Sequence, residues 1–174
     1  MYKFKGNYYV LSLIVVFFIL PGRLQGYLWR DFFNGRKLMS INNSEEAIYH
    51  FKKFEDKLNK KPWLKNAIYL AGFIYTKSIM VMTLNNLGAC YLESGKFNDA
   101  KNYFESALEI DTQFPLSYYN LSIISEIEDY HELAINQFNT SVELGYSRNT
   151  LDQVIHKAGE MYAQFEGRAK NEKA

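Results

Sequence analysis

The 174-residue sequence predicts an all-α fold, in which short helix hairpins stack into a right-handed solenoid. Apolar residues recur at three- and four-residue intervals, the spacing that places them on one face of a helix. Residues that interrupt regular structure are sparse, with 10 Gly and 3 Pro. A pattern of small and large side chains at positions 84–108 also returns at positions 118–142. A fixed repeat of this kind predicts stacked units that share one core.

The N-terminal segment, positions 1–26, predicts a membrane anchor or a signal segment. Lys3 and Lys5 precede an uncharged run whose strongly apolar part, Tyr8–Leu20, has 13 residues. A complete span needs about 20 residues and at least about 17, whereas a run of this shorter length is typical of a signal-peptide core. No small-residue cleavage motif follows, so we favour an uncleaved, single-pass N-terminal anchor. A cleaved signal with export, or burial of the segment in the fold, are the alternatives. Both flanks are basic, and the orientation therefore stays open.

Residues 27–80 predict a degenerate first repeat and an extra apolar helix. In the stretch 28–61, Gly35, Ala47 and Phe51 have the same mutual spacing as the small and large residues of the clearer copy that follows. The segment Pro62–Met80 then breaks the frame of the repeat and is long enough for one helix. Its two lysines leave too short an uncharged stretch between them for a second span. A buried or groove-lining helix is therefore expected here.

Residues 81–114 predict two helices joined by a tight turn. Small side chains let the helices approach closely, and large ones fill the space that this leaves. Gly95 marks the end of the first helix, since glycine commonly follows the last helical residue. The small and large residues that carry this pattern are Leu84, Leu87, Gly88, Tyr91, Phe97, Ala100, Tyr103, Phe104, Ala107, Leu108 and Ile110.

The same pattern returns in residues 115–148, so two repeats are expected over 81–148. One hairpin cannot bury its own apolar faces, and a second copy is needed to cover them. A looser turn is expected in the second copy, where IEDYH replaces ESGKF. The matching pairs are Leu84 and Tyr118, Leu87 and Leu121, Gly88 and Ser122, Ala100 and Ala134, Phe104 and Phe138, Ala107 and Ser141, and Leu108 and Val142.

Residues 149–174 predict a capping helix followed by a frayed tail. Asn149 or Thr150 is expected to cap its start. A solenoid needs a terminal helix with a polar outer face, and this helix has one apolar side for the core. The expected apolar stripe consists of Leu151, Ile155, Ala158, Tyr162 and Phe165.

Residues 81–148 resemble the tetratricopeptide repeat family, whose period of about 34 residues equals the shift between the two copies. The signature positions are occupied by Leu84, Leu87, Gly88, Tyr91, Ala100, Phe104 and Ala107. The family's proline near the end of a repeat corresponds here to Pro115, slightly displaced. The resemblance implies a solenoid that binds other proteins and carries out no catalysis.

In this family the first helix of each repeat lines a concave groove. Some members hold a peptide carboxylate with Lys and Asn, but Asn85 and Ala89 occupy those places here. The resemblance therefore implies an apolar groove with acidic edges, suited to an amphipathic or extended segment bearing Lys or Arg. Filling of the groove by the chain's own residues 62–80 is the alternative. The implied groove residues are Asn85, Ala89, Leu92, Glu93, Tyr119, Ile123, Glu126 and Ile127.

No motif in the chain predicts catalysis, a cofactor or a metal. The one cysteine, Cys90, lies in an apolar helical pattern and is expected to be a small buried residue. The three histidines lack the spacing of metal ligands. Four carboxylates surround His131 at a predicted turn, where a solvated acidic loop is expected rather than an acid–base site. No small-molecule substrate is therefore expected.

Charge is divided along the chain. Residues 27–80 contain ten Lys or Arg and five Asp or Glu, whereas residues 81–148 contain three and ten. The basic cluster is expected to be a solvated helix face or, because an anchor precedes it, a contact for anionic lipid headgroups. Nucleic-acid binding ranks below both. The residues proposed for lipid contact are Lys52, Lys53, Lys57, Lys60 and Lys61.

Together these features predict a membrane-tethered adaptor that gathers protein partners for assembly or transport of a larger complex. The alternative is a regulatory or docking subunit of a membrane enzyme or transporter. Neither identity follows from fold alone.

Overall fold

The computed structural model describes Arg23 and residues 26–65 and 76–171. The described residues form helices and connecting turns, without a β-strand. The anchor or signal segment predicted for residues 1–26 lies outside them, apart from Arg23 and Gly26. Within the described part, no helix combines the length and the apolarity needed to cross a bilayer. The helices are α3 (Arg30–Met39), α4 (Ser44–Lys60), the 3-10 helix η2 (Pro62–Leu64), α5 (Ile79–Glu93), α6 (Phe97–Ile110), α7 (Pro115–Ile127), α8 (His131–Glu143) and α9 (Leu151–Asn171).

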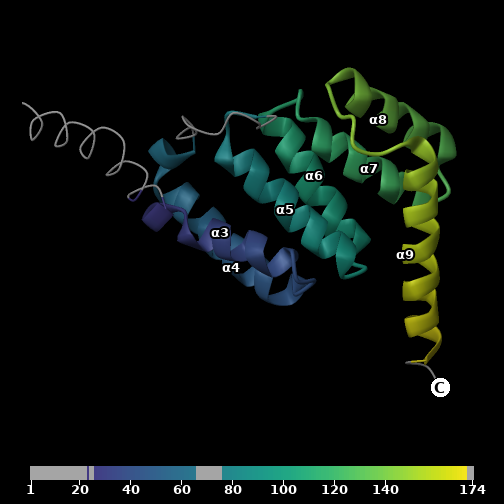
Figure 1. The fold of residues 1–174 in the computed structure, drawn as a ribbon, viewed down its shortest axis with the longest axis horizontal. Helices are drawn as coiled ribbons and strands as arrows, with labels where there is room; N and C mark the ends of the chain where they lie inside the picture. The colour runs from purple at the N-terminus through teal and green to yellow at the C-terminus, as the bar shows by residue number, and fades with distance from the viewer. Residues whose placement is uncertain (1–22, 24–25, 66–75, 172–174) are drawn as a thin grey trace, which may run out of the picture.

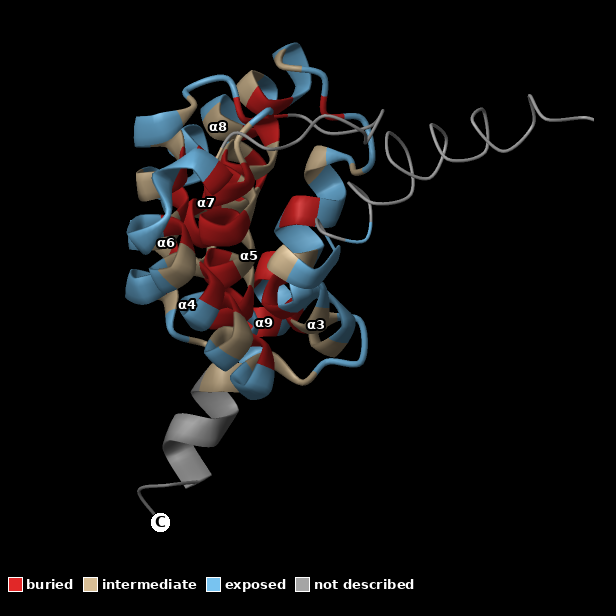
Figure 2. Ribbon diagram, turned by 90° about the vertical axis from the view of Figure 1, so that its left-hand side faces the viewer, coloured by how far each residue is buried: buried red, intermediate tan, exposed pale blue. Residues whose placement is uncertain are grey.

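The described helices pair into three hairpins that stack in chain order. α3 packs against α4, α5 against α6 and α7 against α8, while α4 contacts α5 and α6 contacts α7 (Figure 1). Buried residues concentrate where the hairpins face one another (Figure 2). The all-α stack predicted from the sequence is therefore the fold of the described residues.

Each of the first two hairpins closes on a glycine. The ring of Phe104 on α6 lies so close to Gly88 on α5 that a Cβ there would be 2.5 Å from it. In the preceding hairpin, the Phe51 ring stands over Gly35 in the same way, at 2.8 Å from a Cβ. The shift from Gly35 to Gly88 equals the shift from Phe51 to Phe104. Residues 28–61 therefore use the packing that the shared spacing predicted.

All three hairpin turns place one residue in the left-handed region. These residues are Asn42 (φ 57°), Gly95 (φ 75°) and Asp129 (φ 63°). In each turn the next residue's N–H bonds back to a carbonyl five positions earlier, at 2.8–3.0 Å. This is the Schellman ending of a helix. The prediction of a looser turn in the second copy is therefore wrong, because Asp129 adopts the conformation of Gly95.

The extra helix predicted over Pro62–Met80 differs from the structure at both ends. Residues 62–64 form η2, and Ile79 and Met80 already belong to α5. The Ile79 N–H donates to the Lys65 carbonyl at 3.0 Å, so the two ends of this stretch lie side by side. The rest of the predicted helix, residues 66–75, falls outside the described residues.

α9 leaves the order of the stack. Its main contacts are with α7, the first helix of the last hairpin, and it runs along one end of the molecule (Figure 1). Thr150 caps its start, since the Gln153 N–H donates to Thr150 Oγ1 at 3.4 Å and the Gln153 side chain accepts from the Thr150 N–H at 3.0 Å. Of the two predicted caps, Thr150 is thus the one that forms.

The buried face of α9 differs from the predicted stripe. Val154 and Met161 are 0% and 6% exposed, whereas Ile155 and Tyr162 are 45% and 52% exposed. Ala158 is buried as predicted. The inward face therefore contains Val154, Ala158, Met161 and Phe165, at helical spacings of four, three and four. α9 therefore packs on the first helix of the last hairpin, with a buried face that is shifted from the predicted one.

Candidate functional site

The predicted groove lies on α5 and α7, and part of it is tied together by hydrogen bonds between these helices. Asn85 of α5 is buried, and its side-chain oxygen accepts from Ser117 Oγ at 3.3 Å and from Asn120 Nδ2 at 3.1 Å. Both donors belong to α7. Asn85 therefore joins two repeats, and its amide oxygen is already satisfied within the chain.

The apolar groove residues are mostly covered. Leu92 and Ile123 are fully buried, while Ala89 and Ile127 are partly buried against the core. The ring of Tyr119 stacks on Tyr146, which precedes α9, with centroids 4.5 Å apart. The predicted groove is thus not an open apolar channel.

The cover extends to the turn between α5 and α6. Lys157 Nζ of α9 pairs with Glu93 Oε1 at 3.2 Å. The Phe165 ring meets Phe97 edge to face, with centroids 5.6 Å apart, and it stands where a Cβ on Gly95 would lie. The chain's own α9 therefore spans from α7 to the end of α5 in the preceding hairpin. The sequence had suggested residues 62–80 for this place.

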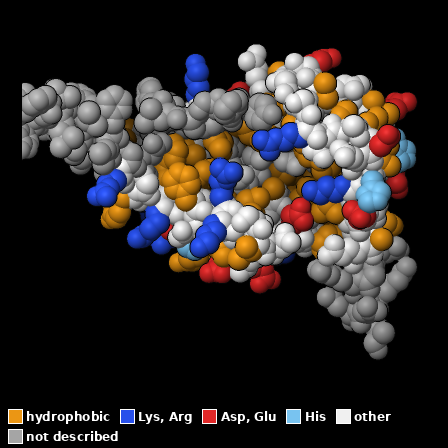
Figure 3. All heavy atoms as spheres, in the orientation of Figure 1, with side chains coloured by type: hydrophobic (Ala, Val, Ile, Leu, Met, Phe, Trp, Pro, Cys, Tyr) orange, Lys and Arg blue, Asp and Glu red, His pale blue; other side chains and the backbone are white. Residues whose placement is uncertain are grey.

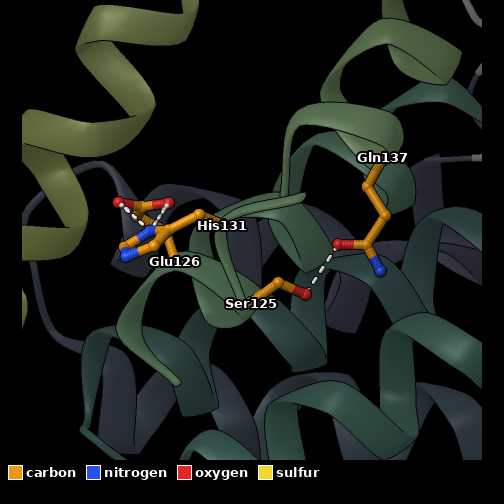
Figure 4. A network of polar contacts seen from close by, with 4 residues as sticks. All are labelled: Ser125, Glu126, His131 and Gln137. Carbon is orange, nitrogen blue, oxygen red and sulfur yellow. Dashed lines mark hydrogen bonds and ion pairs between the residues drawn. The ribbon is translucent and has the colours of Figure 1, made fainter. Parts of the chain in front are cut away.

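Glu126 forms the second acidic edge, and it has a local partner. Its side chain is 13% exposed and contacts His131 Nδ1 at 3.0 Å. This hydrogen bond, with the charge of Glu126, raises the pKa of His131. Next to it, Ser125 Oγ donates to the Gln137 side chain at 2.7 Å, which fastens α7 to α8 (Figure 4). Glu126 thus lies within α7 and is mostly buried, which differs from the solvated acidic loop predicted around His131.

The basic residues proposed for lipid contact are largely engaged within the chain. Lys53 pairs with Asp31 at 3.4 Å and Lys60 with Asp56 at 2.6 Å. Lys57 Nζ donates to the carbonyl of Leu28 at 2.5 Å. Two of these contacts join α4 to α3 and to the residues just before it, and the third lies within α4. They reduce the positive charge that is available for lipid headgroups.

Lys52 has an aromatic partner. Its Nζ lies 5.5 Å from the centroid of the Tyr91 ring, and a hydrogen bond to Tyr91 raises the pKa of Lys52. Tyr91 in turn stacks on Tyr103, with centroids 5.3 Å apart. Lys52 therefore joins the first hairpin to the second. Lys61 follows the last residue of α4 and, like Lys52, Lys53 and Lys60, is exposed.

Charge is divided in space as it is along the chain. On the face shown in Figure 3, most Lys and Arg side chains lie over the left and centre, whereas Asp and Glu side chains are most frequent on the right and also occur along the lower edge. α8 itself contains no Lys or Arg. A partner that meets this end of the molecule therefore faces negative charge.

Several residues of this site were missed from the sequence. Ser117 and Asn120 lie in the first half of α7, but their hydrogen bonds to Asn85 depend on how the hairpins stack. Lys157 and Phe165 come from α9, whose position no local pattern indicated. Tyr146 is likewise far from Tyr119 in the sequence, so no local pattern links the two rings.

The site has no arrangement that suits a metal ion or a reactive thiol. Among the described residues, no three His, Cys, Asp or Glu side chains are grouped to hold a metal. Cys90 is buried, and burial, together with the charge of Glu93, raises its pKa to about 12. The thiol is therefore protonated near neutral pH and packs as a small apolar side chain.

Comparison with known protein families agrees with the geometry of the second hairpin. The tetratricopeptide repeat family model matches residues 81–114. The match covers α6 and all of α5 except its first two residues, and it ends just before α7. No curated protein matches the chain. A tetratricopeptide repeat suggests a protein–protein interaction scaffold, and members of the family are typically not catalysts.

Proposed function

We propose that this protein is a membrane-tethered adaptor, which uses the surface of α5 and α7 to bind a segment of a partner protein. The observation that carries the proposal is the tetratricopeptide repeat match on one hairpin of a stack of three among the described helices. Such stacks present extended surfaces whose residues come from successive hairpins.

The charge of this surface supports a basic partner. Glu93 lies at the end of α5 and Glu126 near the end of α7. Each already attracts a basic group of the chain, Lys157 and His131 respectively. A partner segment that combines apolar side chains with Lys or Arg would meet the same carboxylates.

The membrane tether is supported by the end of the molecule where the N-terminal segment joins α3. α4 ends beside the start of α3, because Lys57 bonds to the Leu28 carbonyl. Two exposed aromatic residues, Tyr27 (68%) and Trp63 (66%), lie at this end, close in sequence to Arg30 and Lys61. Aromatic and basic side chains are favoured at the level of lipid headgroups. A tethered adaptor also gains local concentration, so its individual contacts need not be strong.

Crosslinking of the full-length protein in its native membranes, followed by mass spectrometry, tests the proposal. We expect captured partners to be linked to residues beside Glu93 and Glu126. Charge reversal of both carboxylates to Lys should reduce this capture, while reversal of Glu105, an exposed α6 carboxylate outside the groove, should leave it unchanged. Equal capture by all three proteins, or no protein partner at all, would contradict the proposal.

A further inference from the structure

We propose that α9 occupies the place of a partner helix, and that binding of a partner to the α5–α7 surface requires α9 to move away. This inference rests on the proposed function and concerns the same surface. It also specifies the partner segment as an amphipathic helix, because the chain itself shows which helix fits.

The first step is that α9 is held by side chains of one face. Val154, Ala158, Met161 and Phe165 point toward the stack. The face of α9 beside this stripe is exposed, including the apolar Ile155 and Tyr162. A helix held along one stripe buries much less surface than a helix inside the stack, so its release costs less than unfolding a hairpin.

The second step is that α9 does not occupy the position of a next repeat. Within the stack, the first helix of each new hairpin packs on the second helix of the hairpin before it, as α5 does on α4 and α7 on α6. α9 instead packs on α7, and it reaches Glu93 and Gly95 in the preceding hairpin. Removing α9 would therefore leave the three hairpins in contact with one another.

The third step concerns which side chains a helix needs in order to bind where α9 lies. Its contacts require apolar side chains at positions 1, 5, 8 and 12 of a helix, which are Val154, Ala158, Met161 and Phe165. Position 4 is Lys157, and its ammonium pairs with Glu93 at 3.2 Å. A partner helix with this spacing and a Lys or Arg at position 4 would satisfy the same groups. The basic residue expected in the partner is thus placed at position 4 of its helix, opposite Glu93.

Effective concentration explains why the resident helix competes well. α9 follows α8 through a short connection, and such a tether holds a segment at about millimolar concentration. A separate peptide at about micromolar concentration should therefore displace wild-type α9 only weakly. Substitutions that weaken the contacts between α9 and the hairpins should then increase binding of the separate peptide.

The experiment uses full-length protein and a fluorescent peptide of residues 150–165 as the probe, with binding followed by anisotropy. We expect V154D/M161D to bind the peptide at least about tenfold more tightly than wild type, because a tethered helix competes at about millimolar concentration. The matched control is I155D/Y162D, which places the same charges on the exposed face of the same helix and should behave as wild type.

Two further proteins keep the result interpretable if V154D/M161D loses structure by circular dichroism. K157E changes one half-exposed side chain, and it should raise peptide affinity about two- to fivefold, in proportion to the loss of a surface ion pair. In the background C90S, the substitutions E93C and K157C, joined by a bifunctional thiol reagent, should hold α9 in place and abolish peptide binding.

The proposal is overturned if the two double variants bind the peptide equally, if no variant binds it, or if the crosslinked protein binds as well as the uncrosslinked one. Failure of the adaptor function would look different. In that case the peptide would behave as expected, while crosslinking in native membranes would capture no protein at the α5–α7 surface.

Discussion

At the scale of single residues, the contact between Gly88 and Phe104 decides how closely α5 and α6 approach. A methyl group at position 88 would lie 2.5 Å from the Phe104 ring, inside van der Waals contact. We expect Gly88→Ala to lower the free energy of unfolding by about 1–3 kcal/mol, because an overpacked core must shift. Urea denaturation followed by circular dichroism measures the change.

Gly159 provides the matched control for this prediction. It lies in the exposed part of α9, and nothing stands within 4 Å of the place where its Cβ would be. Alanine is a better helix former than glycine by about 1 kcal/mol. Gly159→Ala should therefore leave stability unchanged or increase it. A loss for both variants would show that the effect at position 88 is not one of packing.

Burial should make Cys90 unreactive in the folded protein. Its pKa is raised to about 12, so thiolate is scarce at pH 8, and its side chain has no access to solvent. We expect a thiol reagent such as DTNB to react with Cys90 only after unfolding, with a rate that follows the opening of the α5–α6 hairpin. Immediate stoichiometric labelling of native protein would contradict the buried position.

The His131–Glu126 contact predicts a pH-dependent contribution to stability. The hydrogen bond to Glu126 raises the pKa of His131 in the folded state. A raised pKa means that folded protein holds the proton more tightly than unfolded protein. The contribution is therefore complete below the unfolded pKa of His131, and it is lost as pH rises through the folded pKa.

An NMR titration of the His131 ring measures this shift directly. Glu126→Gln should move the pKa of His131 back toward its ordinary value, because the negative charge is removed while the size is kept. A His131 titration that is identical in both proteins would exclude the contact in solution.

At the scale of helices and turns, substitutions at Gly95 and at Gly145 distinguish the cost of backbone strain from the cost of a clash with α9. Both have positive φ values, 75° and 98°, and any L residue there costs about 1–2 kcal/mol. Only Gly95 also has the Phe165 ring at the site of a Cβ. Gly95→Ala should therefore destabilise more than Gly145→Ala, as measured by thermal unfolding.

Repeating both glycine substitutions in a Phe165→Ala protein identifies the source of the difference in stability. In Phe165→Ala protein, the ring no longer opposes a methyl group at position 95, and the two glycine substitutions should cost similar amounts. A difference that persists without the ring would place its origin in the turn itself.

The hairpins could be predicted from sequence because their signals are local. Gly88, Ala100 and Phe104 have a spacing that two close helices require, and the same spacing at Gly35, Ala47 and Phe51 marks the α3–α4 hairpin. The equivalence of Asp129 with Gly95 was missed, although the shift that aligns the two repeats also aligns these residues. The chemical difference between Asp and Gly concealed a common backbone conformation, which Asp tolerates better than most residues.

The position of α9 could not be predicted in the same way. Its sequence carries apolar residues on two adjacent faces, one with Val154 and Met161 and one with Ile155 and Tyr162. Periodicity alone does not decide which face is buried. That choice depends on the direction of the chain after Gly145 and on partners, such as Glu93, that lie far away in sequence.

At the scale of the whole molecule, its two tryptophans report on opposite environments. Trp29 is 5% exposed, whereas Trp63 is 66% exposed at the end of the molecule next to the N-terminal segment. If that end meets a membrane, Trp63 should enter the headgroup region. We expect anionic vesicles to shift Trp emission to shorter wavelength and to protect it from acrylamide.

Single substitutions assign this signal. Trp63→Phe should remove the vesicle-dependent change, while Trp29→Phe should keep it. Protein that sediments with vesicles but leaves Trp63 fully quenched would separate membrane binding from the proposed orientation. Protein that does not sediment at all would contradict the tether.

The order of α9 after the three hairpins has a consequence for synthesis. The ribosome makes the chain from the N-terminus, and domains begin to fold as they emerge. The three hairpins rely on contacts that are close in sequence, and they precede residues 151–171 in the chain, so they leave the ribosome before α9 does. For that interval the nascent protein presents its α5–α7 surface without a competitor. A partner helix made at the same place and time would then assemble with it co-translationally, before the surface closes.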